Sequence, residues 1–177
     1  VYAVRWTGGG GFGDPFDRAP ADIDQDLGDL AITLEAARTI YGAVLGADGR
    51  VDVAATAAER ARIRRSRLNG GAGKSRTGDL LFQASPTLDA RKDTGGSYWA
   101  CSKCSADLGP LHDNYKHHCI REDKPVASSN PLIGDPARYI DDDVAFRQFF
   151  CTGCGSLVDN EISVTSDPVL HDVVPEV

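Results

Sequence analysis

The chain has 177 residues and a formal net charge of −7, with 41% apolar and 25% charged residues. This composition is that of one globular domain or two small ones, and the acidic balance argues against nucleic-acid binding by bulk charge. Because no apolar run approaches the roughly 20 residues of a membrane span and no signal peptide opens the chain, we expect a cytoplasmic protein without membrane contact. Methionine is absent, so Val1 indicates a trimmed start or a piece of a longer chain.

The first elements along the chain are a short strand and a glycine-rich turn. Residues 1–6 are rich in β-forming side chains and are followed by the glycine-rich residues 8–13. A strand of this length is unstable alone. We therefore predict that it belongs to a sheet completed by another polypeptide.

Three helices are predicted next. Apolar residues at helical spacing indicate helices over residues 21–30 and 34–45, with Thr33 as the N-cap of the second. An alanine-rich helix is predicted over residues 53–67, with Asp52 as its N-cap.

Five arginines lie near the end of the third predicted helix, namely Arg60, Arg62, Arg64, Arg65 and Arg67. Cationic side chains there suit the negative end of the helix dipole. The favoured interpretation is a solvent-exposed cationic helix end, and contact with phosphate or nucleic acid is the alternative.

The sequence divides into four segments, which we predict to be a helical segment over residues 1–68, a linker over 69–97, a zinc-ribbon domain over 98–166 and a tail over 167–177. The division follows a Gly/Ser-rich break after residue 68 and the confinement of all cysteines to the third segment. The predicted fold class is α+β: a short N-terminal strand and two to three helices, then a small β-rich zinc ribbon.

Two Cys-x-x-Cys units, Cys101/Cys104 and Cys151/Cys154, carry the strongest functional signal. A two-residue spacer lets one tight turn present two thiolates to one ion, and zinc takes four such ligands in a tetrahedron. The sequence around each pair is β-type, as in a zinc ribbon. Four thiolates leave no open coordination position, so the expected zinc is structural and activates no water.

Three other interpretations of the cysteines are weaker. Disulfides need an oxidising compartment, a redox dithiol usually comes as a single pair beside a βαβ unit, and an iron site with the same four ligands stays open. Cys119, which follows His117 and His118, is predicted to be a buried bystander. A nucleophilic role with a histidine base would need a third, orienting group, and none is identifiable.

Three further motifs are weak. Gly73-Lys74-Ser75 looks like the end of a phosphate-binding loop, but Leu68 stands where that motif needs glycine. Residues 8–13 could wrap an anion with backbone N–H groups, and residues 141–143 could bind a hard cation. Each is more simply a turn. We therefore predict no catalytic and no cofactor-binding residues in this chain.

Two resemblances to known families follow from these motifs. The first covers about residues 1–67, which resemble the signature near the end of hydantoinase B-type subunits. The residues that carry this resemblance are 8–18, 34–45, 48–52 and 54–56. That family includes N-methylhydantoinases and the large subunits of acetone and acetophenone carboxylases, which work in ATP-using complexes. The second covers about residues 98–164 and resembles the small zinc-binding subunit of acetone carboxylase-type enzymes.

Together the resemblances imply a zinc-binding, non-catalytic accessory subunit of an ATP-dependent, biotin-independent ketone carboxylase complex. Residues 1–68 would be its hydantoinase B-like docking segment, whose strand and helices dock into a large hydantoinase B-like partner. The implied partners are larger hydantoinase A-like and hydantoinase B-like subunits, which would hold ATP and, if the reaction needs one, a divalent metal. The alternatives are a subunit of an ATP-dependent hydantoinase or cyclic-amide hydrolase, and a nucleic-acid-binding zinc ribbon. The acidic charge of the ribbon segment weighs against the last.

Overall fold

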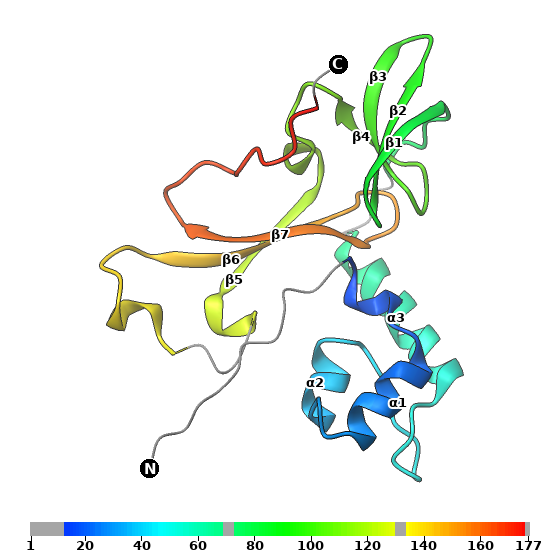
Figure 1. The fold of residues 1–177 in the computed structure, drawn as a ribbon, viewed down its shortest axis with the longest axis vertical. Helices are drawn as coiled ribbons and strands as arrows, with labels where there is room; N and C mark the ends of the chain where they lie inside the picture. Colours follow the sequence, from blue (N-terminus) through cyan, green and yellow to red (C-terminus); the bar gives the residue numbers. More distant parts are fainter. Residues whose placement is uncertain (1–12, 69–72, 130–133, 176–177) are drawn as a thin grey trace.

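The structure is a computed structural model that describes residues 13–68, 73–129 and 134–175. Over these residues, three α-helices are followed by two antiparallel β-sheets, which confirms the predicted α+β class. The helices gather at one end of the molecule and the sheets at the other (Figure 1). The strand predicted over residues 1–6, and the glycines before Gly13, lie outside the described residues.

The helical end contains a 3-10 turn and three helices: η1 (Pro15–Asp17), α1 (Pro20–Gly28), α2 (Leu34–Thr39) and α3 (Val53–Arg67). Both predicted caps are confirmed, because the Thr33 side chain accepts from the Ala36 N–H and the Asp52 side chain accepts from the Ala55 N–H. The bounds of α3 agree with those predicted for it.

The second helix is shorter than predicted. It ends at Thr39 and not at residue 45, because Gly42 has a φ of +60°, which an α-helix does not allow. Beyond it, the chain turns inward and Leu45 forms an isolated β-bridge with Val51. A small apolar core holds this part together, formed by Ile23, Ala37, Ala43 and Val51.

The first sheet has four strands in the order in which they follow along the chain: β1 (Asp79–Ser85), β2 (Leu88–Asp93), β3 (Gly96–Cys101) and β4 (Asp107–Pro110). Two of these strands lie within residues 69–97, where the sequence predicted a linker, so the structure differs from that prediction. Only the first half of β2 is buried, including Leu88 and Ala90, and its second half is polar. The strand therefore lacks the run of apolar residues from which a β-strand is predicted.

The second sheet has three strands: β5 (Ile120–Pro125), β6 (Val144–Phe150) and β7 (Leu157–Val164). Short 3-10 turns connect the elements around it: η2 (Tyr115–His118), η3 (Val126–Ser128) and η4 (Pro136–Arg138). The β-type sequence noted beside each cysteine pair is thus confirmed as strand β3, strand β6 and strand β7.

The two sheets share one apolar core at the place where they meet. Trp99 of β3 is fully buried and stacks edge-on against Tyr115, with ring centroids 5.6 Å apart. The Thr87 hydroxyl, at the turn between β1 and β2, donates to the Val158 carbonyl of β7. Cys101 and Cys151 belong to this same core, so the cysteine pairs lie at the junction of the sheets.

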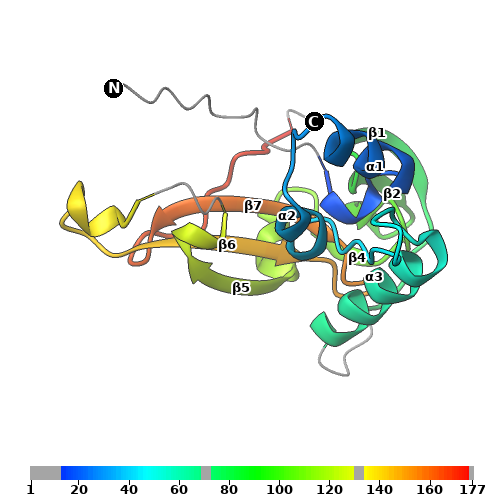
Figure 2. The ribbon, with the colours of Figure 1, turned by 90° about the horizontal axis from the view of Figure 1, so that it is seen from below.

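The C-terminal residues are held against the second sheet. From the end of β7 they run back toward η2 (Figures 1 and 2), where the Asn114 side-chain amide donates to the Leu170 carbonyl. Lys116 forms an ion pair with Asp172 at 3.1 Å. None of the described helices has the length and apolar character that crossing a bilayer requires.

Candidate metal centre

Each cysteine pair lies in the tight turn at the end of a hairpin, the first between β3 and β4 and the second between β6 and β7. The two turns share a hydrogen-bond pattern. The Cys101 N–H donates to the Ala106 carbonyl at 2.9 Å, and the Cys151 N–H donates to the Ser156 carbonyl at 2.9 Å. Because the pattern repeats, both turns present their two thiols in the same way. We call these turns the first and second knuckle, residues 101–106 and 151–156.

Two glycines of the second knuckle have different reasons to be there. Gly155 has a φ of +69°, a left-handed conformation that favours glycine. Gly153 is not among the positive-φ glycines. It is needed for space, because a Cβ there would lie 2.8 Å from the Ala106 Cβ and 2.9 Å from the Cys104 sulfur.

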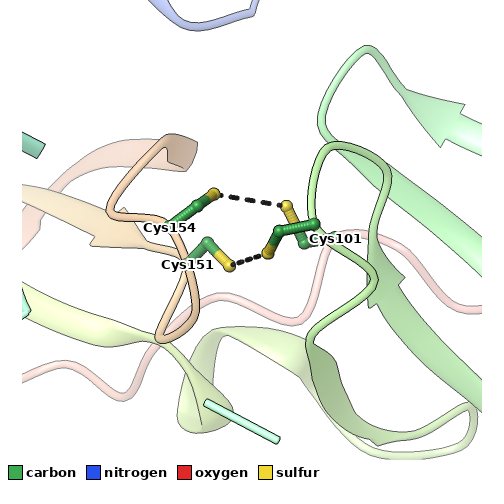
Figure 3. A group of neighbouring side chains, drawn as sticks. Cys101, Cys151 and Cys154 are labelled. Atoms are coloured by element: carbon green, nitrogen blue, oxygen red, sulfur yellow. Dashed lines mark hydrogen bonds between the residues drawn. The ribbon is translucent and has the colours of Figure 1, made fainter. Parts of the chain in front are cut away.

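The four predicted thiols converge on one point. The Sγ atoms of Cys101, Cys104, Cys151 and Cys154 all lie within 4.8 Å of one another. Figure 3 shows the Cys101 side chain facing those of Cys151 and Cys154. The Cys101 and Cys154 sulfurs are 3.8 Å apart, and the Cys104 and Cys151 sulfurs are 3.6 Å apart. Zn–S bonds of about 2.3 Å in a tetrahedron place the sulfurs about 3.8 Å apart, whereas a disulfide bond measures about 2.05 Å. The four cysteines could therefore hold a metal ion such as zinc.

Mutual contacts and burial shift the pKa values of three of these thiols in different directions. Hydrogen bonds from Cys101 and Cys151 lower the pKa of Cys154, while the contacts with Cys101 and Cys154, together with burial, raise the pKa of Cys151. The pKa of Cys101 rises to about 12, because contact with Cys154 and burial outweigh the opposing hydrogen bond with Cys151. Four thiolates in contact repel one another, so a bound cation is what would let all of them ionise.

The residues after the glycine-rich break join the two knuckles. The Gly73 N–H donates to the Thr152 carbonyl at 2.9 Å, and Ser75 forms a β-bridge with Ala106 and donates its hydroxyl to the Cys104 carbonyl. The motif that resembled a phosphate-binding loop thus braces both cysteine turns. Lys74 contributes its carbonyl, which accepts from the Asp107 N–H.

Cys119 stays outside the cluster. It follows η2, and its side chain packs against the core shared by the sheets. Burial raises the pKa of Cys119 to about 12, so the thiol is protonated at neutral pH and is a poor nucleophile. The neighbouring His118 Nε2 lies 3.6 Å from a carboxylate oxygen of Asp113.

Three of the five arginines of α3 are not the solvent-exposed cations that the sequence suggested. Arg60 is buried and donates to the Tyr41 carbonyl, Arg64 pairs with Asp14 at 2.7 Å, and Arg67 donates to the Gly155 carbonyl at 2.8 Å. The prediction is wrong for these three because their partners lie far away in the sequence. It holds for the two exposed arginines of the helix, Arg62 and Arg65.

The acidic run of residues 141–143 is exposed in the loop before β6. Within the part of the chain that the structure describes, the four cysteines are the one group of three or more metal-ligating side chains that lie close enough to share an ion. The structure therefore gives the acidic run no further ligand.

Two cysteine hairpins face each other across the thiol cluster, an arrangement that suggests a zinc ribbon, and a helical segment precedes them. Residues 79–177, more than half of the chain, match the family model described as acetone carboxylase gamma subunit. The chain therefore belongs to the acetone carboxylase gamma subunit family. This agrees with the resemblance noted for its second half.

Two relatives match shorter parts of the chain. The chain is 48% identical over 72 residues to the acetone carboxylase alpha subunit of Xanthobacter autotrophicus, a match that covers 38% of this chain and 9% of that subunit. It is 43% identical over 54 residues to the caprolactamase subunit beta of Pseudomonas jessenii, covering 30% of this chain and 9% of the relative. The chain thus spans about 9% of the length of each relative. Both names support the carboxylase and hydantoinase-like family.

Proposed function

We propose that this protein is a zinc-binding accessory subunit of an ATP-dependent, biotin-independent ketone carboxylase complex. The match of residues 79–177 to the acetone carboxylase gamma subunit family carries the proposal, and the four-thiol cluster supports its metal-binding part. The larger hydantoinase A-like and hydantoinase B-like partners would bind ATP and perform the chemistry.

The proposed metal has a structural role. An ion held by Cys101, Cys104, Cys151 and Cys154 has no open position for water or substrate. It would tie the end of β3 to the end of β6, and so fasten the first sheet to the second. Structural zinc of this kind contributes about 10–16 kcal/mol of apparent binding free energy, which becomes folding free energy because the site does not exist in the unfolded chain.

A second candidate function is a subunit of an ATP-dependent cyclic-amide hydrolase. The relative named caprolactamase subunit beta favours it, since caprolactam is a cyclic amide. The accessory role of this chain and its zinc would be the same in both cases. The two proposals differ only in the substrate of the partner subunits.

One experiment tests both. The protein is tagged in its native host, purified with its bound chains, and analysed by mass spectrometry and by metal analysis. The complex is then assayed with ATP, bicarbonate and a ketone, and separately with ATP and a cyclic amide. We expect large hydantoinase A-like and B-like chains, one zinc per copy of this chain, and carboxylation of the ketone. Hydrolysis of the cyclic amide alone would favour the second candidate, and purification without such chains would contradict both.

A further inference from the structure

The end of α3 lies directly against the second knuckle. Arg67 donates to the Gly155 carbonyl at 2.8 Å, and its guanidinium lies 4.1 Å from the centre of the Phe150 ring. A Cβ on Gly155 would overlap the Arg64 carbonyl, so the helix backbone touches the turn itself. This contact therefore uses both a charged hydrogen bond and close backbone packing.

Asp14 makes a second contact between the helical segment and the sheets. Its side chain is buried, and one carboxylate oxygen accepts from the Leu157 N–H at 3.3 Å and from Arg64 at 2.7 Å. The other oxygen accepts from the Phe16 N–H at 3.0 Å. Leu157 is the first residue of β7, so Asp14 holds η1 against the strand that leaves the second knuckle.

The first knuckle takes part through Lys103, which stands between the two cysteines of its pair. Its ammonium forms an ion pair with Asp17 and lies 3.7 Å from Asp14. Arg64 also contacts Asp17, at 3.0 Å. Cations from the helix and from the knuckle thus meet on the same two carboxylates, and this charge pattern fixes how the helical segment lies on the cysteine turns.

Two parts of the chain that relate to different subunits therefore meet at this contact. The family match to a gamma subunit covers residues 79–177, while the resemblance to hydantoinase B-type large subunits covers about residues 1–67. A relative of the chain is an acetone carboxylase alpha subunit, which this chain matches over 72 residues at 48% identity. The helical segment, residues 14–67, and the ribbon are joined here in one polypeptide.

We propose that the knuckle face, formed by Lys103, Phe150, Gly155 and Leu157, is a docking surface for the helical segment of an alpha-type subunit. Residues 14–67 are the equivalent of that segment, carried by the same chain and docked in cis. In this proposal the helices dock on the chain's own ribbon, whereas the resemblance implied docking into a separate large subunit. The face of α3 that carries Arg64 and Arg67 is already used within the chain. The inference deepens the proposed function, but it does not depend on the reaction that the complex performs.

The test cuts the chain between the two parts after folding. A protease site is placed between Leu68 and Gly73 of the full-length protein, and the zinc-loaded protein is cleaved and examined by size-exclusion chromatography and native mass spectrometry. We expect the two pieces to stay together with the mass of the whole chain. Separation of the pieces while the ribbon piece keeps its zinc would overturn the docking.

Matched arginine variants show whether the knuckle contact holds the pieces. Arg67→Ala should weaken their association at least about tenfold, because it removes a charged hydrogen bond and a cation–π contact. Arg62→Ala, on the exposed side of the same helix, should leave it unchanged. Asp14→Asn, which keeps the side-chain shape, gives a second measurement should the Arg67 variant fold poorly. Equal association of all variants would overturn the proposed contact.

A separate experiment tests whether the segment that docks on the knuckle face is of the alpha-subunit type. Peptides are added to the cleaved protein: residues 14–67 of this chain, and the region of the acetone carboxylase alpha subunit that aligns with this chain. We expect both to exchange with the resident helical piece. Exchange by the first peptide and not by the second would overturn the alpha-type assignment. None of these experiments measures carboxylation. A result that contradicts the docking is therefore distinct from one that contradicts the proposed function.

Discussion

Ser105 and Gly155 occupy equivalent positions in the two knuckles, and both have a left-handed backbone, with φ values of 58° and 69°. Each follows the second cysteine of its pair. The Ser105 N–H donates to the Cys101 carbonyl at 2.8 Å, and the Gly155 N–H donates to the Cys151 carbonyl at 2.9 Å. A side chain makes this conformation unfavourable by about 1–2 kcal/mol. The first knuckle therefore carries a strain that the second avoids.

Replacing Ser105 by glycine should relieve that strain. The gain of about 1–2 kcal/mol is partly offset by the larger unfolded-state entropy of glycine, about 0.5–1 kcal/mol, so we expect Ser105→Gly to stabilise the zinc-loaded protein by up to about 1 kcal/mol. Denaturant unfolding followed by circular dichroism measures the change. A clear loss of stability would show that the serine is there for a contact of its own.

The opposite change at the equivalent position should be damaging. Gly155→Ala introduces the left-handed strain and also places a Cβ against the Arg64 carbonyl. Together these effects should destabilise the protein by about 2–5 kcal/mol. The same unfolding experiment checks this, and Gly49→Ala serves as the control: Gly49 has a φ of +78° with no neighbour near its missing Cβ, so it reports the strain without the clash.

Loss of one thiol should abolish metal binding. In Cys101→Ser we expect less than one zinc per chain and loss of structure over residues 98–164, because three thiolates no longer close the site. Cys119→Ser should keep one zinc, since Cys119 lies outside the cluster. Metal analysis and the visible spectrum after cobalt substitution measure both variants. In the unmodified chain, zinc should be released as the pH falls, because the ligands must be deprotonated.

A fully structured Cys101→Ser ribbon without metal would contradict the structural role of the ion. Equal zinc loss in the Cys119 variant would instead show that the cluster extends beyond the four sulfurs.

A buried cation outside the metal centre should be important for stability. The Lys116 side chain is fully buried, with its ammonium 3.1 Å from Asp159, 3.2 Å from Glu161 and 3.1 Å from Asp172. Lys116→Met keeps the apolar stem but removes the cation shared by three carboxylates, of which Glu161 is buried and retains only its pair with Arg147 at 3.0 Å. Breaking a buried ion pair in this way should cost about 3 kcal/mol. Lys124→Met removes a more exposed pair with Glu122 and should cost less than about 1 kcal/mol. Thermal and denaturant unfolding compare the two, and equal losses would contradict this view of the cluster.

The ion pair of Arg76 and Asp93 predicts a pH dependence. Two hydrogen bonds from Arg76, each 2.7 Å long, and a third from the Gly95 N–H lower the pKa of Asp93 to about 2. A carboxyl with a lowered pKa adds stability above its unfolded pKa of about 4, and this stability is lost as the pH falls through the folded value.

We therefore expect Asp93→Asn to be less stable than the unmodified chain by an amount that is constant from about pH 7 to pH 5 and shrinks as the pH falls from about 4 toward 2. Unfolding of both proteins at each pH gives this difference, in which effects of zinc release cancel. Asp79→Asn, an exposed position of the same sheet, is the control. A difference that grows on acidification would contradict the prediction.

The sequence by itself determined those features whose interactions span only a few residues. The cap of α3 connects Asp52 to Ala55, and each knuckle closes within six residues around a Cys-x-x-Cys unit. Such contacts leave a fixed spacing in the sequence, so the bounds of α3, the strands beside the cysteines and the four clustered thiols could all be predicted.

Only the tertiary structure decided what the arginines of α3 contact and that β1 and β2 replace a linker. Arg67 and Gly155 are 88 residues apart, and Asp14 and Leu157 are 143 apart. A pair at such a separation leaves no spacing signal, because the chain between the partners can take any length or path. Charge alone made α3 resemble a solvent-exposed helix end, whereas in the folded chain carboxylates, carbonyls and an aromatic ring contact three of its arginines, of which Arg60 is buried.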